Sequence, residues 1–163
     1  MSEYDVVVVG LGAMGSAAAY QLARRGQRVL GLDAFEPGHT FGSSHGETRI
    51  IRLAYYEHPS YVPLLRRAYA LWDQLEHESG ERLRYQTGGL FIGAADGEIV
   101  TGCLRSAQQH QLAHELLDAR EIRRRFPVFE PRDDEAGVFE HVAGVLFPER
   151  CIAAYLKLAN RRG

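Results

Sequence analysis

A glycine-rich turn directly after an apolar run constrains this chain more than any other feature of its sequence. Val6 to Val9 form an unbroken β-branched run, which favours a strand buried on both faces of a parallel sheet. The run leads into Gly10-Leu11-Gly12-Ala13-Met14-Gly15, a G-x-G-x-x-G turn, and small residues follow it. Gly26 is placed to end the helix that these residues would begin. The order predicts an α/β fold that starts with a Rossmann-like βαβ unit.

Each glycine of the turn has a separate physical task in a dinucleotide site. Gly10 permits the tight turn, Gly12 lets the backbone approach a pyrophosphate, and Gly15 lets the helix pack close to the strand. The helix N-terminus attracts the anion. Residues 29–32 predict the second strand, and Asp33 stands 18 residues after Gly15, where a carboxylate accepts a ribose hydroxyl. Together these features favour a dinucleotide site over an ordinary glycine turn.

The chain after the second strand departs from a nicotinamide-binding unit, in which another helix and strand usually follow. Residues 34–44 contain Pro37 with several glycines and serines, so we expect a long loop. Later patterns predict helices over 60–80, 98–109, 121–126 and 151–162, and strands over 83–86, 90–92, 138–140 and 145–147. The third parallel strand is therefore expected far downstream, after an inserted α+β segment. Since the last predicted helix would feed that strand, we expect the sequence to stop before it and before the substrate domain.

Composition and charge exclude several classes of protein. The chain has 163 residues, 45% hydrophobic and 25% charged, which is typical of one globular domain. A net charge of -2 gives no general attraction to nucleic acid or to a membrane surface, and no segment approaches the roughly 18 apolar residues of a membrane-spanning helix. Cys103 and Cys151 lack metal-ligand spacing, so we expect two core thiols, no metal site and a cytoplasmic protein.

The segment from Gly42 to Arg52 contains two arginines three residues apart, with two isoleucines between them. Ser44 and Glu47 fit a capping box, which would begin a helix. An extended chain would instead turn Arg49 and Arg52 to opposite faces. The pattern leaves both interpretations open. In either case we expect both isoleucines to be buried, and a partly desolvated arginine then requires an anion.

Four stretches of the sequence resemble a known family. They are VVVVGLGAMGSAAAYQLARRG, DAFEPGHTFGSSHGETRIIR, SYVPLLRRAYALW and GVLFPERC. They are similar to the N-terminal part of the monomeric sarcosine oxidase and N-methyltryptophan oxidase family, within the FAD-dependent amine and D-amino-acid oxidase superfamily. The resemblance covers essentially all 163 residues. The glycine motif is generic, whereas the order of residues from Gly42 to Arg52 is specific to the sarcosine oxidase branch.

The resemblance implies a role for each basic residue of this segment. Arg52 would bind the substrate carboxylate on one face of the flavin, while Arg49 and His45 would act in catalysis at the opposite face. Opposite faces favour the extended interpretation. The residues expected to bind FAD are Gly10, Gly12, Ala13, Met14, Gly15, Asp33, Ala34, Gly42, Ser43, Ser44 and Ile50.

The resemblance also implies an activity, the FAD-dependent oxidation of a secondary amine to an imine with reduction of O2 to H2O2. The substrate would be a small N-methyl or cyclic amino acid such as sarcosine, N-methyltryptophan or pipecolate, and the full-length relatives would be monomers. Family members often carry histidines where Ser44 and Leu53 stand, which shifts the resemblance towards pipecolate and peroxisomal sarcosine oxidases. The alternatives are an NAD-dependent dehydrogenase and a non-catalytic nucleotide-binding fragment.

The expected division of the chain follows from this resemblance. Residues 1–55 would form the FAD-binding βαβ unit and the loop that meets flavin and substrate. Residues 56–148 would begin the substrate domain, and residues 149–163 would form a helix that returns to the FAD-binding domain. The family's cysteine for covalent flavin and its oxygen-activating lysine would lie beyond Gly163, so residues 1–163 alone are expected to be inactive.

Overall fold

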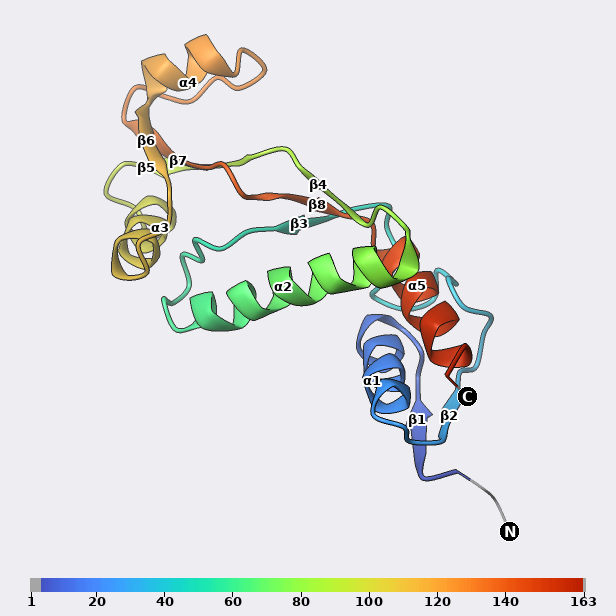
Figure 1. Ribbon diagram of the computed structural model, residues 1–163. Helices are drawn as coiled ribbons and strands as arrows, with labels where there is room; N and C mark the ends of the chain where they lie inside the picture. Colours follow the sequence, from blue (N-terminus) through green and yellow to red (C-terminus); the bar gives the residue numbers. More distant parts are fainter. Residues whose placement is uncertain (1–3, 163) are drawn as a thin grey trace. The chain divides into compact units, whose positions relative to one another are not determined.

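The chain folds into two compact units, each built from separate stretches of sequence. The computed structural model describes residues 4–162. Unit 1 falls within residues 1–49, 71–84 and 146–163, and unit 2 comprises residues 50–70 and 85–145. The chain passes between the units within α2 (Tyr61–Ser79) and at β3 (Arg49–Ile51), β4 (Arg84–Gln86) and β8 (Gly144–Leu146), which pair in the order β3-β8-β4 (Figure 1).

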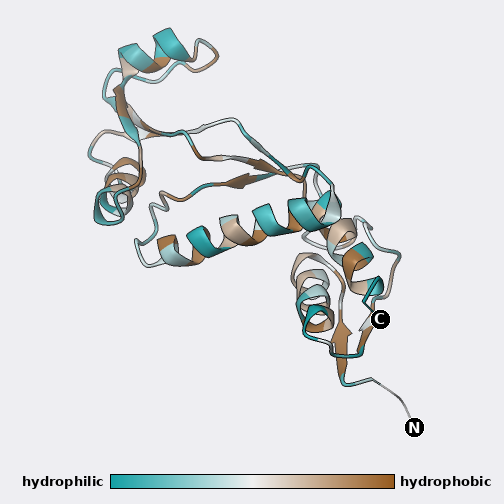
Figure 2. Cartoon of the chain, in the orientation of Figure 1, coloured by the Kyte–Doolittle hydropathy of each residue, from teal (hydrophilic) through white to brown (hydrophobic). Residues whose placement is uncertain are grey.

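Unit 1 begins with the predicted βαβ unit, formed by β1 (Val6–Val9), α1 (Ala13–Arg24) and β2 (Val29–Leu32). The two strands are parallel, with Val6 opposite Val29. Figure 2 shows that both strands are largely apolar. Gly26 adopts a φ of +80° just after α1, which confirms the predicted helix stop. The parallel sheet contains β1 and β2 alone within the described residues.

The expected burial of β1 on both faces is wrong for the described chain. Val7 and Val9 are 54% and 82% exposed. Side chains alternate along a strand, and α1 packs against the other face, where a Cβ added to Gly15 would lie 3.4 Å from Val8. One face of β1 is therefore covered and the other is open.

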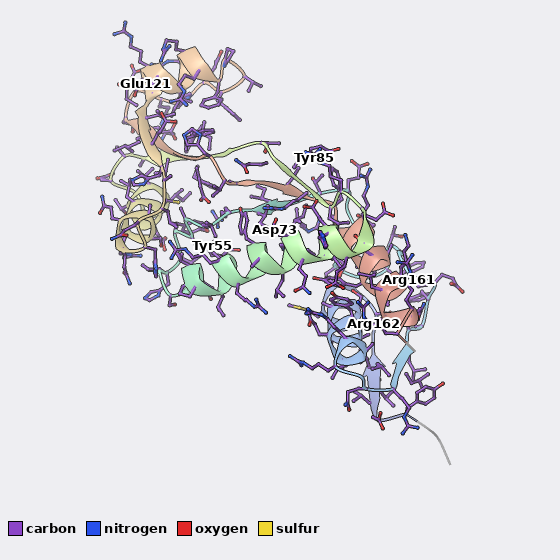
Figure 3. All side chains as sticks on the ribbon, viewed as in Figure 1. Tyr55, Asp73, Tyr85, Glu121, Arg161 and Arg162 are labelled. Atoms are coloured by element: carbon purple, nitrogen blue, oxygen red, sulfur yellow. The ribbon has the colours of Figure 1, made fainter. Side chains whose placement is uncertain are left out.

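The core of unit 1 forms where α5 (Pro148–Asn160) packs against α1 (Figure 1). The rings of Tyr20 and Tyr155 lie 5.4 Å apart, and Cys151 is buried beside them as predicted. Burial raises the pKa of the Cys151 thiol to about 12, so it is not a reactive thiolate. At the edge of this core, Arg162 (labelled in Figure 3) donates to the Glu78 carboxylate over 2.9 Å.

Unit 2 contains an antiparallel sheet, two complete helices and the first part of α2. Its strands are β5 (Gly89–Ala94), β7 (Glu135–Glu140) and β6 (Glu115–Asp118), in that order, and its helices are α3 (Glu98–Gln109) and α4 (Ala119–Arg125). A capping box begins α4: Asp118 accepts the N–H of Glu121 over 2.7 Å, and the Glu121 side chain accepts the N–H of Asp118. The buried cluster of this unit contains Ala54, Val62, Val100, Cys103, Ala107, Leu112, Ala136 and Val138.

Most predicted elements are present, with boundaries shifted by a few residues. The loop over residues 34–44 and the helix over 98–109 are confirmed. The two strands predicted on either side of Gly88 exist but belong to different sheets, and β6 was not predicted. Of the two interpretations left open after Ser44, the capping box is excluded because the chain forms no helix there, and the extended one is confirmed at Arg49–Ile51. Among the described residues no helix is both long and apolar enough to cross a bilayer.

Candidate cofactor and substrate site

The glycine turn brings β1 close to α1, and its glycines are required by backbone conformation at Gly10 and by lack of space at Gly15. Gly10 has a φ of +86°, and a Cβ on Gly15 would overlap the carbonyl oxygen of Gly10. A Cβ on Gly12 would lie 3.1 Å from Ser44 Oγ. In the first turn of α1, the N–H groups of Met14 and Gly15 meet no acceptor among the described residues. The turn therefore presents free donors and the positive end of a helix dipole.

Ser44 caps α1 from a distant part of the chain. Its Oγ accepts the N–H of Ala13 over 3.1 Å. The local helix that the sequence pattern also allowed after Ser44 does not form. The Ser44 hydroxyl instead holds the loop over residues 34–44 against the start of α1, where a phosphate would bind.

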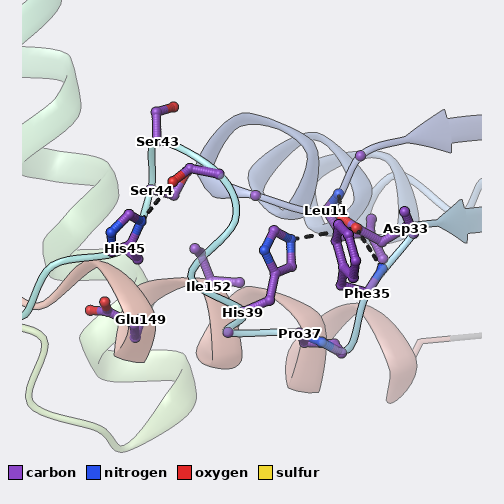
Figure 4. Close-up of a pocket in the computed structure, with 15 residues that line it drawn as sticks. Leu11, Asp33, Phe35, Pro37, His39, Ser43, Ser44, His45, Glu149 and Ile152 are labelled. Carbon is purple, nitrogen blue, oxygen red and sulfur yellow. Dashed lines mark hydrogen bonds and ion pairs between the residues drawn. The ribbon is translucent and has the colours of Figure 1, made fainter.

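Asp33 is an ionised acceptor at the end of β2. Its carboxylate accepts the N–H groups of Leu11 over 2.6 Å and Phe35 over 3.2 Å, and His39 Nε2 lies 3.5 Å away (Figure 4). The hydrogen bond from Leu11, followed by that from Phe35, holds the pKa of Asp33 below its usual range. A carboxylate fixed in this way is ready to accept a hydroxyl group.

Two cavities flank the turn and share part of their walls. The first has a volume of about 310 Å³ and includes Asp33, Ala34 and His45 in its lining (Figure 4). The second has a volume of about 700 Å³ and includes Met14 and Arg49. Both are lined by Gly10, Gly12, Ser43 and Ser44. This arrangement suits an elongated ligand that passes across the turn.

Arg49 is bound by the backbone of its own loop. Its Nη1 donates to the carbonyls of Gly46 and Thr48 over 3.1 and 2.9 Å. Its Nη2 donates to those of Ser43 and His45 over 3.1 and 2.6 Å. All four acceptors are neutral, so the loop fixes the guanidinium without cancelling its charge.

Two further contacts hold the same loop. His45 Nδ1 lies 2.6 Å from the carbonyl oxygen of Gly42, and Glu149 accepts the N–H of Gly46 over 2.6 Å. The hydrogen bond from Gly46 lowers the pKa of Glu149, and Arg49 contributes by its charge. Sequence reasoning missed Glu149. The available signal was an acidic residue next to Pro148 in the first turn of a helix.

Arg52 lies in unit 2 and has a different environment. Its guanidinium carbon is 4.5 Å from the ring centre of Tyr55 (labelled in Figure 3), 5.2 Å from that of Tyr56 and 4.9 Å from that of Phe91. Nη2 donates to the Glu57 carboxylate over 3.1 and 3.3 Å. The Arg52 side chain is 15% exposed, whereas that of Glu57 is 40% exposed. A desolvated cation thus has a solvated, replaceable partner.

The structure places the residues predicted to bind FAD beside the two cavities, with one exception. All of them except Ile50 line one cavity or the other. Ile50 is 72% exposed, whereas Ile51 is 8% exposed, so the expected burial of both isoleucines is wrong for Ile50. The two lie next to each other on β3, where adjacent side chains point to opposite faces. In the described residues, no cluster of three or more His, Cys, Asp or Glu side chains could hold a metal ion.

Comparison with known proteins gives consistent matches along the chain. The family model DAO, described as FAD dependent oxidoreductase, matches residues 5–163. The chain is 52% identical to a monomeric sarcosine oxidase of Streptomyces avermitilis over 160 residues, which is 98% of this chain and 42% of that protein. It is 42% identical to an N-methyl-L-tryptophan oxidase of Yersinia pestis over 161 residues, 99% of this chain and 43% of that protein.

A solved structure has the same fold. The open form of NikD, an unusual amino acid oxidase essential for nikkomycin biosynthesis, matches with a TM-score of 0.82 and 32% sequence identity. The match covers 98% of this chain and 42% of NikD. The chain therefore spans less than half the length of the relatives that it matches.

Proposed function

Because the chain belongs to the DAO family of FAD dependent oxidoreductases, we propose that it binds FAD along the glycine turn and serves the oxidation of a secondary amine in a small amino acid. Sarcosine, N-methyltryptophan and pipecolate are the substrates we favour. When bound, FAD supplies the two-electron oxidation of the amine to an imine, with O2 as the final acceptor and H2O2 as the product. The complete protein would work as a monomer in the cytoplasm.

The residues around the turn fit the parts of FAD. The unpaired N–H groups of Met14 and Gly15 would bind the pyrophosphate at the positive end of α1. Asp33, already fixed by two backbone donors, would accept a ribose hydroxyl. Gly42, Ser43 and Ser44, with the rest of their loop, would line the path towards the ring.

The basic residues would have two separate roles, charge stabilisation during the reaction and binding of the substrate carboxylate. Arg49, held by neutral carbonyls and joined by His45, would supply positive charge where negative charge develops during the reaction. Arg52 would bind the substrate carboxylate through its planar guanidinium. The observation that carries the substrate assignment is the environment of Arg52: a side chain only 15% exposed, whose partner Glu57 is exposed enough to be replaced.

The test uses the complete protein that carries this sequence. Purified protein should show flavin absorption and should release peroxide with sarcosine, N-methyl-L-tryptophan or pipecolate, whereas amines without a carboxylate should react poorly. Calorimetric titration with NAD is the control. Micromolar affinity for NAD without flavin absorption would replace the proposal with a nicotinamide-dependent dehydrogenase.

The oxidase turnover of residues 1–163 in isolation can be measured separately. They match only 42% of the sarcosine oxidase of Streptomyces avermitilis, and we propose that they have no oxidase turnover when isolated. The fragment would be purified, supplied with FAD and tested for peroxide release. Turnover within about tenfold of a full-length relative, a difference of roughly 1.4 kcal/mol in activation free energy, would contradict this expectation.

A further inference from the structure

Glu140, the last residue of β7, is a buried carboxylate that the proposed function does not use. Its side chain is 0% exposed, and burial raises its pKa above the usual range. Both oxygens are occupied: Oε1 accepts the N–H of Leu53 over 2.7 Å, and Oε2 accepts the N–H of Ala54 over 2.8 Å. A buried carboxylate is stable only with such partners.

The two amides belong to the residues that directly follow Arg52. In an extended strand, consecutive N–H groups point to opposite sides. Here both converge on one carboxylate, and the chain bends at Leu53. Glu140 therefore fixes the direction in which the backbone leaves Arg52.

Helix α3 holds the carbonyl side of the same segment. Cys103 Sγ donates to the carbonyl of Ala54 over 3.2 Å, and Ser106 Oγ donates to that of Tyr55. A Cβ on Gly102 would overlap the carbonyl oxygen of Tyr56, so the backbone lies directly against the helix. The segment from Leu53 to Tyr56 is thus bound along its whole length within unit 2.

We propose that Glu140 is a positioning residue for carboxylate recognition: by accepting the N–H groups of Leu53 and Ala54, it holds Arg52 in the place where the guanidinium meets the substrate carboxylate. This inference rests on the proposed function of Arg52 and deepens it. A segment ordered by folding does not have to be ordered again when substrate binds, which favours affinity. Glutamate suits the task because two amides need two acceptor atoms, whereas glutamine offers one acceptor and one donor.

The experiment compares E140Q with Ile122→Ala in the complete, FAD-loaded protein. Ile122 is also 0% exposed in unit 2 but lies outside the buried cluster that contains Ala54, so its truncation controls for a general loss of stability. Three measurements are made on each variant: hydrogen exchange of the amides of Leu53 and Ala54, acetate binding followed by flavin absorbance, and kcat and KM for sarcosine.

E140Q should accelerate exchange at Leu53 and Ala54, and should raise the acetate Kd and the sarcosine KM about tenfold, the effect of one charged hydrogen bond. Flavin content and kcat should change little. E140D, which keeps the charge but has a shorter reach, should fall between E140Q and the parent protein. Should E140Q fail to accumulate, E140D decides the question by the same measurements.

Two results would overturn the inference. One is unchanged amide exchange and acetate affinity in E140Q. The other is an equal loss of affinity in Ile122→Ala at an equal fall in melting temperature, which would reduce Glu140 to a structural role. Failure of the proposed function looks different: the parent protein itself would show no acetate response and no turnover, while the exchange data would still test whether Glu140 holds the segment.

Discussion

Arg49 and Arg52 stand three residues apart in the sequence, but the structure holds them in different ways. The guanidinium of Arg49, in unit 1, donates to four backbone carbonyls of its own loop. That of Arg52, in unit 2, rests among aromatic rings and donates to one exposed carboxylate. An arginine whose two terminal nitrogens already donate to backbone carbonyls mainly supplies charge, whereas one with an exchangeable partner can bind a ligand. The order of the residues does not distinguish them, but their acceptors do.

The largest effect expected on the unit 1 side is that of Gly15→Ala. The added Cβ would overlap the carbonyl oxygen of Gly10, so β1 and α1 must separate and FAD binding should be lost. The measurement is flavin content after purification. The matched change in unit 2 is Gly102→Ala, which overlaps the Tyr56 carbonyl and should weaken carboxylate binding while flavin is retained. Loss of flavin in both variants would remove the distinction between the two regions.

Arg52→Ala should come next in size. Removing one partner of a desolvated charge pair costs about 2–5 kcal/mol, so the KM for a carboxylate substrate should rise about a hundredfold or more while flavin content is unchanged. Arg52→Lys keeps the charge but not the planar pair of donors, and should recover only part of the affinity. Steady-state kinetics with an amino acid and with its uncharged amide separate these effects. An unchanged KM in Arg52→Ala would show that the carboxylate binds elsewhere.

Arg49→Ala should have a smaller effect than Arg52→Ala, and it should act on the cofactor and the reaction rate instead of on substrate affinity. Four loop carbonyls lose their donor and the cavity loses its positive charge, so FAD affinity and the rate of flavin reduction should fall about tenfold, with little change in substrate affinity. Rapid-mixing reduction without oxygen measures the rate, and titration of apoprotein with FAD measures affinity. If KM rose more than the reduction rate fell, the roles assigned to the two arginines would be exchanged.

The smallest effect concerns pH and Glu149. Because the hydrogen bond from Gly46 lowers its folded-state pKa, Glu149 contributes stability above the ordinary glutamate pKa, and the contribution is lost as pH falls through the lowered value. Glu149→Gln keeps an acceptor oxygen but does not titrate. Thermal melts across the acid range should therefore show a shallower loss of stability in Glu149→Gln than in the parent protein. An equal loss of stability with falling pH in both proteins would mean that the pKa of Glu149 is the same in the folded and unfolded states.

The sequence predicted those features that depend on neighbours along the chain. The strand, turn, helix and second strand from Val6 to Leu32 follow from residue order, and the structure has them at the predicted residues. Whether Ser44 would cap a local helix or a distant one could not be predicted, because the N–H that it accepts belongs to Ala13. Glu140 and Glu149 were missed for the same reason: each accepts amides from a segment far away in the sequence, and nothing in its own neighbours marks that partner.

The interleaving of the two units has a consequence for the growing chain. Unit 2 is complete once residue 145 has been synthesised, whereas the core of unit 1 needs Tyr155 and Leu158 of α5 to cover Tyr20 of α1. Closing so long a loop is entropically costly and slow. We therefore expect α1 to gain protection later than the sheet of unit 2, and the nucleotide site to become competent only after that sheet has formed. Pulse-labelling hydrogen exchange during refolding would show the order in which the helices and strands gain amide protection. Protection of α1 before β5 and β7 would contradict the expected order.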